Sequence, residues 1–291
     1  MDRWARWLLQ ERFGGDEAAL ERTLSILGPI RDRVLDRAQL ATADVLLDVG
    51  TGDGLIGFAA LERIGPQGRV VFSDVSDDLL QVCRTVAEQA GAVDRCAFVR
   101  SDAEQLEGIA DASVDVVTTR SVLIYVDDKP AAFDAFARVL RPGGRLSLFE
   151  PINRDVRRLN DGLLFGYDTR AVSELADKVR QVYDTQTPGH SAMLDFDGAD
   201  LAQLAATAGF EAVTASVEIV LESGSWLGPA TLERLRAVRP NPNAPTFGEA
   251  LHRALDDAER SQLEEHLRPQ VEAGAGRSFT VGCFLTGQLP H

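Results

Sequence analysis

The sequence predicts an α/β protein, in which a parallel sheet is covered by helices on both faces and carries further helical segments. From Val45 onward, short apolar runs alternate with amphipathic helical patterns, which is typical of a parallel sheet. A glycine-rich turn follows the first apolar run, at the position where such sheets bind ligands. After Pro151 the alternation stops and helical patterns dominate. We therefore expect a sheet core at 41–152, preceded by a helical N-terminal segment or lid at 1–40.

The elements of this core can be placed from their patterns. A helix is expected at about 55–63, directly after the glycine-rich turn. Ser76 is expected to cap the next helix, because its hydroxyl oxygen can accept a hydrogen bond from the first helical turn. Pro130 suits the first turn of a third helix. The expected strands are 45–47, 69–72, 97–99, 114–118 and 145–149.

The second half of the chain adds helical insertions to the end of the sheet. A helical cap insertion is expected at 153–196, where we find no clear strand pattern. The remainder, 197–291, is expected to contain a strand at about 212–221 and a closing strand at about 279–286. A second helical insertion, at about 225–275, separates these two strands. Since ligands bind beyond the carboxyl ends of parallel strands, we expect both insertions to cover that edge.

Composition limits the classes of partner. The chain has 291 residues and a net charge of -15, with a pI of about 4.7. Such an acidic surface repels phosphate backbones and anionic membranes, so neither a nucleic acid nor a membrane is expected as a partner. The cysteines Cys83, Cys96 and Cys283 are far apart, which favours reduced thiols. With no apolar N-terminal stretch that resembles a signal peptide, we expect a cytoplasmic location.

The strongest local signal is the glycine-rich run from Asp48 to Gly54, which joins a strand to a helix. Gly50 and Gly52 allow the backbone to turn tightly and to approach a ligand closely. Asp74 stands at the end of the next strand, where its carboxylate can accept from two ribose hydroxyls. The run and this acid together predict a ligand that contains adenosine.

Two cofactors satisfy these observations. Gly52, Gly54 and Gly57 form a GxGxxG pattern, which is the dinucleotide-binding fingerprint and would suit NAD. Asp74 serves either cofactor equally well, because NAD and S-adenosylmethionine both present an adenosine ribose. The glycine-rich run alone therefore leaves both cofactors open.

Further motifs resemble those of the class I S-adenosylmethionine-dependent methyltransferases, the group that includes the quinone-biosynthesis methyltransferases. They are Ser-Asp-Ala-Glu at 101–104, Ala-Ser-Val-Asp-Val-Val at 112–117 and Arg-Val-Leu-Arg-Pro-Gly-Gly at 138–144. The resemblance extends over about residues 30–150, and NAD enzymes have no reason to combine Asp102 with the Pro-Gly-Gly turn. It implies a Rossmann-like, doubly wound, seven-stranded and mostly parallel sheet with an antiparallel last strand.

The resemblance also implies S-adenosyl-L-methionine as the cofactor, together with the residues that bind it. The glycine-rich turn would lie against the methionine part, and Asp48 would help to hold the amino group directly or through water. Asp74 would accept from the ribose hydroxyls and Asp102 from the adenine amine. The segment after the fourth strand would pass close to the methionine end. The implied cofactor-binding residues are Asp48, Gly50, Thr51, Gly52, Asp74, Val75, Asp102, Ala103, Thr119 and Arg120.

Methyl transfer demands alignment of the nucleophile, the methyl carbon and the sulfur, and a base only where the nucleophile must lose a proton. Tyr125 follows the fourth strand by one turn and is a candidate catalytic residue, the alternative being a half-buried aromatic. His190, in the first insertion, is a second candidate because histidine titrates near neutrality. The alternative for His190 is an exposed or already hydrogen-bonded side chain.

Two related kinds of site are disfavoured. The ends of the fourth and fifth strands hold Thr119, Arg120, Glu150 and Asn153, and one acid with one amide is a poor ligand set for a hard cation. We therefore predict no metal. The segment 118–121 reads Thr-Thr-Arg-Ser, unlike the Asn/Asp-Pro-Pro-Tyr motif of nucleic-acid amino methyltransferases, which argues against a nucleobase substrate.

The leading hypothesis is transfer of a methyl group to an O, N or C atom of a small-molecule acceptor. The alternatives are an S-adenosylmethionine-binding enzyme with non-methylating chemistry, an NAD-dependent oxidoreductase and a noncatalytic cofactor-sensing module. The insertions would determine the acceptor, and exposed helices would allow a homodimer.

Overall fold

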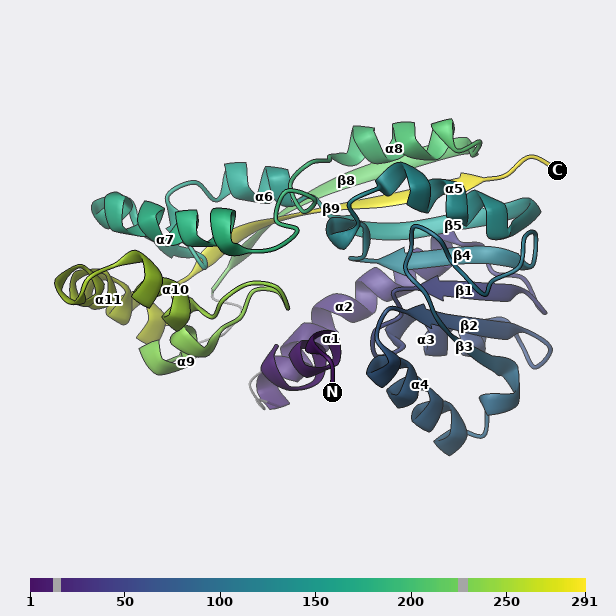
Figure 1. The fold of residues 1–291 in the computed structure, drawn as a ribbon, viewed down its shortest axis with the longest axis horizontal. Coiled ribbons are helices and arrows are strands. Elements are labelled where there is room, and N and C mark those ends of the chain that lie inside the picture. The colour runs from purple at the N-terminus through teal and green to yellow at the C-terminus, as the bar shows by residue number, and fades with distance from the viewer. Residues whose placement is uncertain (13–16, 225–229) are drawn as a thin grey trace.

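A computed structural model of the chain describes residues 1–12, 17–224 and 230–291. Within these residues the core is a seven-stranded sheet with the order β3-β2-β1-β4-β5-β9-β8 (Figure 1). The strands are β1 Val45–Val49, β2 Arg69–Asp74, β3 Cys96–Arg100, β4 Val114–Arg120, β5 Leu140–Pro151, β8 Glu211–Ser223 and β9 Arg277–Gln288. The five strands predicted for the core are therefore confirmed.

The last strand of the chain, β9, runs antiparallel to both of its neighbours. It lies between β5 and β8, whereas β1 to β5 pair in parallel with one another. This confirms the predicted seven-stranded, mostly parallel sheet with an antiparallel last strand. The β8–β9 pair continues beyond the other strands toward the helical insertions (Figure 1).

Helices cover both faces of the sheet, because successive residues of a strand point to opposite faces. Leu46 of β1 packs with Ile56 on one face, and the adjacent Leu47 packs with Phe133 on the other. The helices of the first face are α2 Glu17–Arg37, α3 Leu55–Arg63 and α4 Asp77–Gln89, and those of the second are α5 Lys129–Val139 and α8 Gly198–Thr207. The sheet is therefore doubly wound.

Local capping agrees with the sequence pattern. The Ser76 hydroxyl accepts from the Leu79 backbone N–H at 3.1 Å and begins α4. Pro130 lies in the first turn of α5, where its missing N–H costs no helical hydrogen bond. These caps bring the carboxyl ends of β2 and β4 to defined positions at one edge of the sheet.

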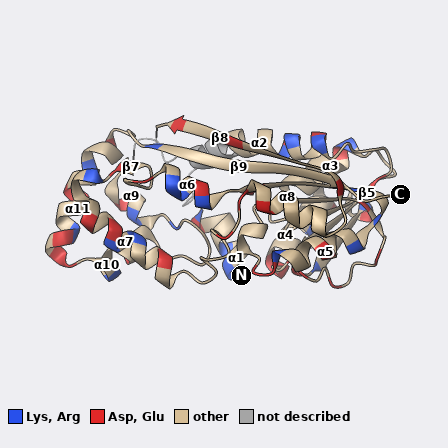
Figure 2. Ribbon diagram, turned by 90° about the horizontal axis from the view of Figure 1, so that it is seen from above, with Lys and Arg blue, Asp and Glu red and all other residues tan. Residues whose placement is uncertain are grey.

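The two insertions pack together into one helical layer, the cap, which comprises residues 153–196 and 230–275. A shared cluster of buried residues joins them, with Val179 and Leu175 from the first insertion against Phe247 and Leu263 from the second. The cap helices are α6 Asn153–Leu159, α7 Ser173–Gln186, α9 Leu232–Ala237, α10 Phe247–Ala254 and α11 Asp257–Glu272. Acidic and basic positions are interspersed along these helices (Figure 2).

Part of the sequence prediction for the insertions needs correction. The first insertion contains a short hairpin of β6 Leu163–Leu164 and β7 Tyr167–Asp168, although no strand was expected there. Two-residue strands are too short to show an alternating pattern. Residues 225–229, where the second insertion was expected to begin, lie outside the described residues.

The start of the N-terminal segment, before α2, lies between the core and the cap (Figure 1). It forms α1 Arg3–Arg6 and the π-helical turn η1 Trp7–Glu11. Asp2 caps α1 through the backbone N–H of Trp4 at 2.9 Å, and the Ser76 hydroxyl donates to the same carboxylate at 2.6 Å. The start of the chain is thus attached to the start of α4. In the part of the chain that the structure describes, no helix combines the length and apolarity needed to cross a bilayer.

Candidate functional site

A cavity of about 400 Å³, the core cavity, opens at the carboxyl ends of β1, β2 and β4. Its volume falls within the range of small-molecule sites, roughly 300–1,000 Å³. Eight residues predicted from sequence line it, namely Gly50, Gly52, Asp74, Val75, Asp102, Ala103, Arg120 and Tyr125. Parallel strands explain this convergence, since their carboxyl ends meet at one edge of the sheet.

The glycine-rich turn forms one wall of the core cavity and requires glycine for two reasons. Gly50 has a φ of +62°, and a Cβ atom there would lie 2.3 Å from a methyl carbon of Val122. Gly52 has a φ of +59°, and its Cβ would lie 3.2 Å from a methyl carbon of Leu8. Side chains at either position would meet both backbone strain and a neighbour. Glycine at these two positions therefore lets the turn present its backbone to a ligand.

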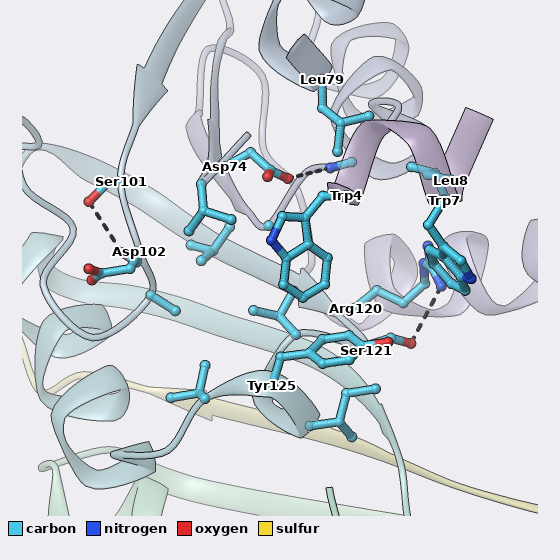
Figure 3. Close-up of a pocket in the computed structure, with 18 of the residues that line it drawn as sticks. Trp4, Trp7, Leu8, Asp74, Leu79, Ser101, Asp102, Arg120, Ser121 and Tyr125 are labelled. Atoms are coloured by element: carbon cyan, nitrogen blue, oxygen red, sulfur yellow. Dashed lines mark hydrogen bonds between the residues drawn. The ribbon is translucent and has the colours of Figure 1, made fainter. Parts of the chain in front are cut away.

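Asp74 occupies the end of β2 with its carboxylate fixed by two backbone donors. The N–H groups of Gly52 and Ser76 each donate to it at 2.9 Å, and the first of these bonds is drawn in Figure 3. Burial raises the pKa of Asp74, and these hydrogen bonds oppose that rise. Each carboxylate oxygen can accept more than one hydrogen bond, so the group retains capacity for ligand hydroxyls.

Asp102 lies on the turn after β3, on the opposite side of Trp4 from Leu8 in Figure 3. The backbone N–H of Gln105 donates to its carboxylate at 2.8 Å, which orients the side chain. Ala103, which follows it, is 5% exposed and lines the same cavity. The Asp102 carboxylate, a hydrogen-bond acceptor next to the Ala103 backbone, suits the polar edge of a nucleobase.

Three of the predicted cofactor-binding residues, Asp48, Thr51 and Thr119, are not among the residues that line the core cavity. Asp48 is fully buried and accepts from the hydroxyls of Thr51 at 2.7 Å and Thr118 at 3.1 Å, and from the Gly57 N–H at 3.1 Å. Burial raises the pKa of Asp48 to about 6 despite these donors. Thr51 and Thr119 are also buried and do not line the core cavity. Asp48 therefore braces the glycine-rich turn from within.

The N-terminal segment supplies residues that the sequence prediction did not assign to the site. Trp4, Trp7, Leu8 and Arg12 all line the core cavity. The Trp4 ring meets the Tyr125 ring edge-on, with centroids 5.0 Å apart and an interplanar angle of 78° (Figure 3). The spacing of Trp4, Trp7 and Leu8 on one helical face is the sequence signal that could have identified them.

Tyr125 lies on the 3-10 turn η3 Leu123–Tyr125, which follows β4. Burial raises the pKa of Tyr125 to about 12. The side chain is therefore a neutral phenol near neutral pH, able to donate a hydrogen bond and to present its ring. It contacts Trp4 and lines the core cavity, and its role as a catalytic residue stays a prediction.

Two arginines line the core cavity together. Arg120 ends β4, and Arg12 follows η1. Burial and the neighbouring positive charge of Arg120 both lower the pKa of Arg12. Two nearby cations in a partly buried site repel one another, so an anionic group placed between them would stabilise both. The carboxylate of an amino-acid ligand has the required charge.

Glu150, at the end of β5, holds the turn that carries Tyr125. It is fully buried, and its carboxylate accepts from the backbone N–H of Val122 at 2.9 Å and of Ile124 at 3.3 Å. Burial raises the pKa of Glu150 to about 7. Ser121, at the start of this turn, has a φ of +58°, a strained value for a residue other than glycine. Glu150 thus compensates for a strained connection.

His190, the second predicted catalytic residue, is not brought to Tyr125. It lies in the cap, where its Nε2 contacts Asp184 at 3.1 Å, and it lines a different cavity. The structure therefore does not join the two candidates in one site. Among the described residues, no group of three His, Cys, Asp or Glu side chains could hold a metal ion.

A protein family described as a methyltransferase domain matches residues 46–144. Residues 46–144 of the chain thus resemble a methyltransferase domain. The match extends from β1 to the Gly-Gly turn in β5 and so includes the glycine-rich turn, Asp74 and Asp102. S-adenosyl-L-methionine is the cofactor of this domain, and solved relatives were determined with S-adenosylhomocysteine or sinefungin.

Relatives agree with this assignment. The ubiquinone/menaquinone biosynthesis C-methyltransferase of Shewanella frigidimarina is 32% identical over 177 residues, which cover 56% of this chain and 64% of that enzyme. The chain thus spans less than two thirds of the length of the curated relatives that it matches. The match to the methyltransferase domain family, at 46–144, lies within the core.

Solved structures share the fold at low sequence identity. Phosphoethanolamine N-methyltransferase 2 of Haemonchus contortus has a TM-score of 0.52 and 16% identity, covering 99% of this chain and 56% of that one. The [4+2]-cyclase SpnF has a TM-score of 0.50 and 19% identity, covering 90% and 81%. One fold therefore carries both methylating and non-methylating enzymes.

The GxGxxG pattern, which suited NAD, has a packing explanation. Gly57 lies within α3, and a Cβ atom there would lie 2.3 Å from a ring carbon of Phe72 on β2. This glycine is required for close approach of helix and strand whichever cofactor binds. The sheet order, with antiparallel β9 between β5 and β8, also differs from the 3-2-1-4-5-6 order of dinucleotide-binding sheets. The methyltransferase interpretation is favoured.

Proposed function

We propose that this protein transfers a methyl group from S-adenosyl-L-methionine to an O, N or C atom of a small-molecule acceptor. The observation that carries the proposal is the convergence of Asp74, Asp102 and the glycine-rich turn on one cavity inside a methyltransferase domain. Each of these features would meet a different part of the cofactor, so their coincidence in one cavity supports the proposal.

The residues of the core cavity fit the cofactor. Asp74 would accept from the ribose hydroxyls and Asp102 from the adenine amine. Gly50 and Gly52, whose positive φ values disfavour any side chain, would face the methionine part. Arg12 and Arg120 would pair with its carboxylate, which relieves their mutual repulsion. When bound, the cofactor supplies an activated methyl group on a positively charged sulfonium.

The chain itself contributes position, shielding and electrostatics. The rings of Trp4 and Tyr125 would present π-electron density to a nearby cation. Tyr125, with a pKa of about 12, would orient the acceptor as a hydrogen-bond donor and not as a base. The N-terminal segment would limit access of water to the cavity, as the lid predicted from sequence.

Titration calorimetry with S-adenosylmethionine, S-adenosylhomocysteine and NAD tests the cofactor. We expect micromolar binding of the first two, weakened more than about tenfold in Asp74→Ala, because hydrogen bonds to a charged group are lost. Asp257→Ala is the matched control, since Asp257 is 96% exposed and lies in the cap. Binding of NAD alone would refute the methyltransferase proposal and favour an oxidoreductase.

A second candidate function keeps the cofactor and changes the chemistry. The similarity of fold to the [4+2]-cyclase SpnF is the observation that supports it. Acceptor turnover without formation of S-adenosylhomocysteine would distinguish this function from methyl transfer. Tight cofactor binding with no turnover of any acceptor would instead indicate the sensing module.

The proposed enzyme acts in the cytoplasm on a small molecule, without nucleic acid or membrane as partner. The net charge of -15 and the free thiols of Cys83, Cys96 and Cys283 support this proposal. A homodimer stays a prediction, which sedimentation equilibrium tests directly. Retention on immobilised DNA or RNA at physiological salt would contradict the proposal on partners.

A further inference from the structure

The cap contains a second cavity of about 400 Å³, the cap cavity, which the proposed cofactor does not use. It lies between α6, α7 and the two separate segments that contain Met193 and Asn241. Most of its wall is apolar, formed by Val156, Leu164, Phe165, Met193 and Leu194. A cavity of this size and character can enclose a ring-sized organic molecule.

Two residues that line the cap cavity carry hydroxyl groups without hydrogen-bond partners among the described residues. The hydroxyl oxygens of Tyr183 and Thr187 are both buried, and both residues line the cavity. Thr187 is only 6% exposed. Burying a hydroxyl without a partner costs about 1–3 kcal/mol, so two such groups in one apolar cavity are unfavourable for folding alone. A ligand oxygen would satisfy them.

The charged groups at this cavity are already paired with one another. Arg157 donates to Asp184 at 2.9 Å, and His190 contacts the same carboxylate at 3.1 Å. Arg180 donates to the backbone oxygen of Leu163 at 3.0 Å and forms an ion pair with Asp177. The cavity thus offers two neutral hydroxyls, and a neutral ligand fits it better than an ion.

Burial raises the pKa of Tyr183 well above its usual value, so this side chain stays a phenol that can donate. The hydroxyl of Thr187 can also donate, and a carbonyl or hydroxyl oxygen can accept from both groups. The Phe165 ring stands edge-on to the Tyr183 ring, with centroids 6.0 Å apart, which provides an aromatic wall beside the donors. Together these groups select an apolar body that carries an oxygen acceptor.

The cap cavity adjoins the core cavity at two points. Pro151 lines the core cavity, and Asn153, two residues later, lines the cap cavity. The Trp7 indole N–H donates to the backbone oxygen of Arg239 at 3.1 Å, and the next residue, Pro240, lines the cap cavity. A molecule bound in the cap is therefore next to the proposed site of methyl transfer.

We propose that the cap cavity binds the acceptor, a neutral molecule with an apolar ring system and a carbonyl or hydroxyl oxygen that accepts from Tyr183 and Thr187. The identification of this ligand as the acceptor rests on the proposed function. Binding in the cap and cofactor binding in the core are separately measurable, so either proposal can fail without the other.

The test uses 2-naphthol as the probe and naphthalene as the matched compound without oxygen. Affinities are measured by calorimetry on the full chain, with and without S-adenosylhomocysteine. We expect 2-naphthol to bind more tightly than naphthalene. Tyr183→Phe and Thr187→Val should each weaken 2-naphthol about fivefold, the effect of one neutral hydrogen bond, and leave naphthalene unchanged. Thr185→Val, on the same helix but exposed, is the control and should change neither.

Thermal unfolding of the variants guards against misfolding. Because the two hydroxyls have no partners in the described structure, their removal should not lower the unfolding temperature. Equal affinity for 2-naphthol and naphthalene overturns the proposal even if one variant fails to fold. Unchanged 2-naphthol affinity in both folded variants, or loss of binding in Tyr125→Phe alone, also overturns it.

Asp74→Ala separates this proposal from the proposed function. That variant should lose S-adenosylhomocysteine but retain 2-naphthol, because Asp74 lines only the core cavity of the two. Binding of 2-naphthol without any cofactor binding would support the cap site and refute methyl transfer. Cofactor binding without 2-naphthol binding would refute the cap site and leave the proposed methyl transfer supported.

Discussion

Replacement of Glu150 by glutamine removes a buried ionisable group beneath the turn that carries Tyr125. Glu150 is fully buried, and burial raises its pKa from 4.5 to about 7. Ionisation of this group is therefore less favourable in the folded protein than in the unfolded chain. The contribution of the protonated Glu150 carboxyl group to the free energy of unfolding is fully present below pH 4.5. It is lost as the pH rises through about 7.

The size of the effect follows from the shift in pKa. Each pKa unit corresponds to about 1.4 kcal/mol, so the displacement from 4.5 to about 7 amounts to about 3 kcal/mol above neutrality. Glutamine keeps one oxygen for the Val122 N–H but does not ionise. It loses the weaker acceptor for Ile124, at a cost of about 1 kcal/mol. Relative to the wild type, Glu150→Gln should thus gain stability with increasing pH.

Urea denaturation between pH 5 and 8.5 measures this difference. We expect the free energy of unfolding of Glu150→Gln, relative to wild type, to rise by about 3 kcal/mol across that range. Glu107→Gln is the control, because Glu107 is exposed. Parallel pH profiles for Glu150→Gln and wild type would refute the assignment of a buried, largely protonated Glu150. Asp48, with a pKa raised to about 6, contributes to both profiles equally.

Three further predictions concern the core cavity. Gly50→Ala should abolish cofactor binding in calorimetry. The control is Gly91→Ala, which has a similar φ of +63° but open space around it, and which should cost only about 1 kcal/mol of stability. Equal losses of cofactor binding in the two variants would contradict the steric argument. Arg12→Met should lower the affinity for S-adenosylmethionine about tenfold, because a charge-assisted hydrogen bond is lost, while Arg268→Met at an exposed position should not change it. Unchanged affinity in Arg12→Met would contradict the proposal that Arg12 pairs with the cofactor carboxylate. Wild type and Tyr125→Phe should have the same flat pH–rate profile between pH 6 and 9, since a phenol with a pKa of about 12 does not act as a base in that range. A pH-dependent limb that is present in the wild type and lost in Tyr125→Phe would show that Tyr125 is the base.

Residues that act through local geometry could be predicted from the sequence. The five core strands, the Ser76 cap and the glycine-rich turn depend on spacings within a few residues, which an alternating or helical pattern expresses directly. Asp74 and Asp102 follow from the same logic, because parallel strands place their carboxyl ends at one edge. The sequence alone therefore determined the core and its ligand-binding edge, while the cofactor followed from the resemblance of its motifs to those of a known family.

Only the tertiary structure decided which side chains face the core cavity. Asp48 has the sequence position of a ligand-binding acid, yet Thr51 and Thr118 enclose it behind the turn. Trp4 and Arg12 reach the cavity because Asp2 attaches the N-terminal segment to α4, a contact between residues 74 apart in sequence. No local pattern encodes such pairings.

The cap shows the same limit more strongly. Its helices were evident from their periodicity, but Tyr183 and Thr187 face a cavity only because both insertions pack together through one hydrophobic cluster. His190 illustrates the converse, since a residue type suited to catalysis was carried into the cap, next to Asp184. Secondary structure follows from neighbours along the chain. Burial, hydrogen-bond satisfaction and pKa shifts follow from neighbours in space, which long-range packing alone brings together.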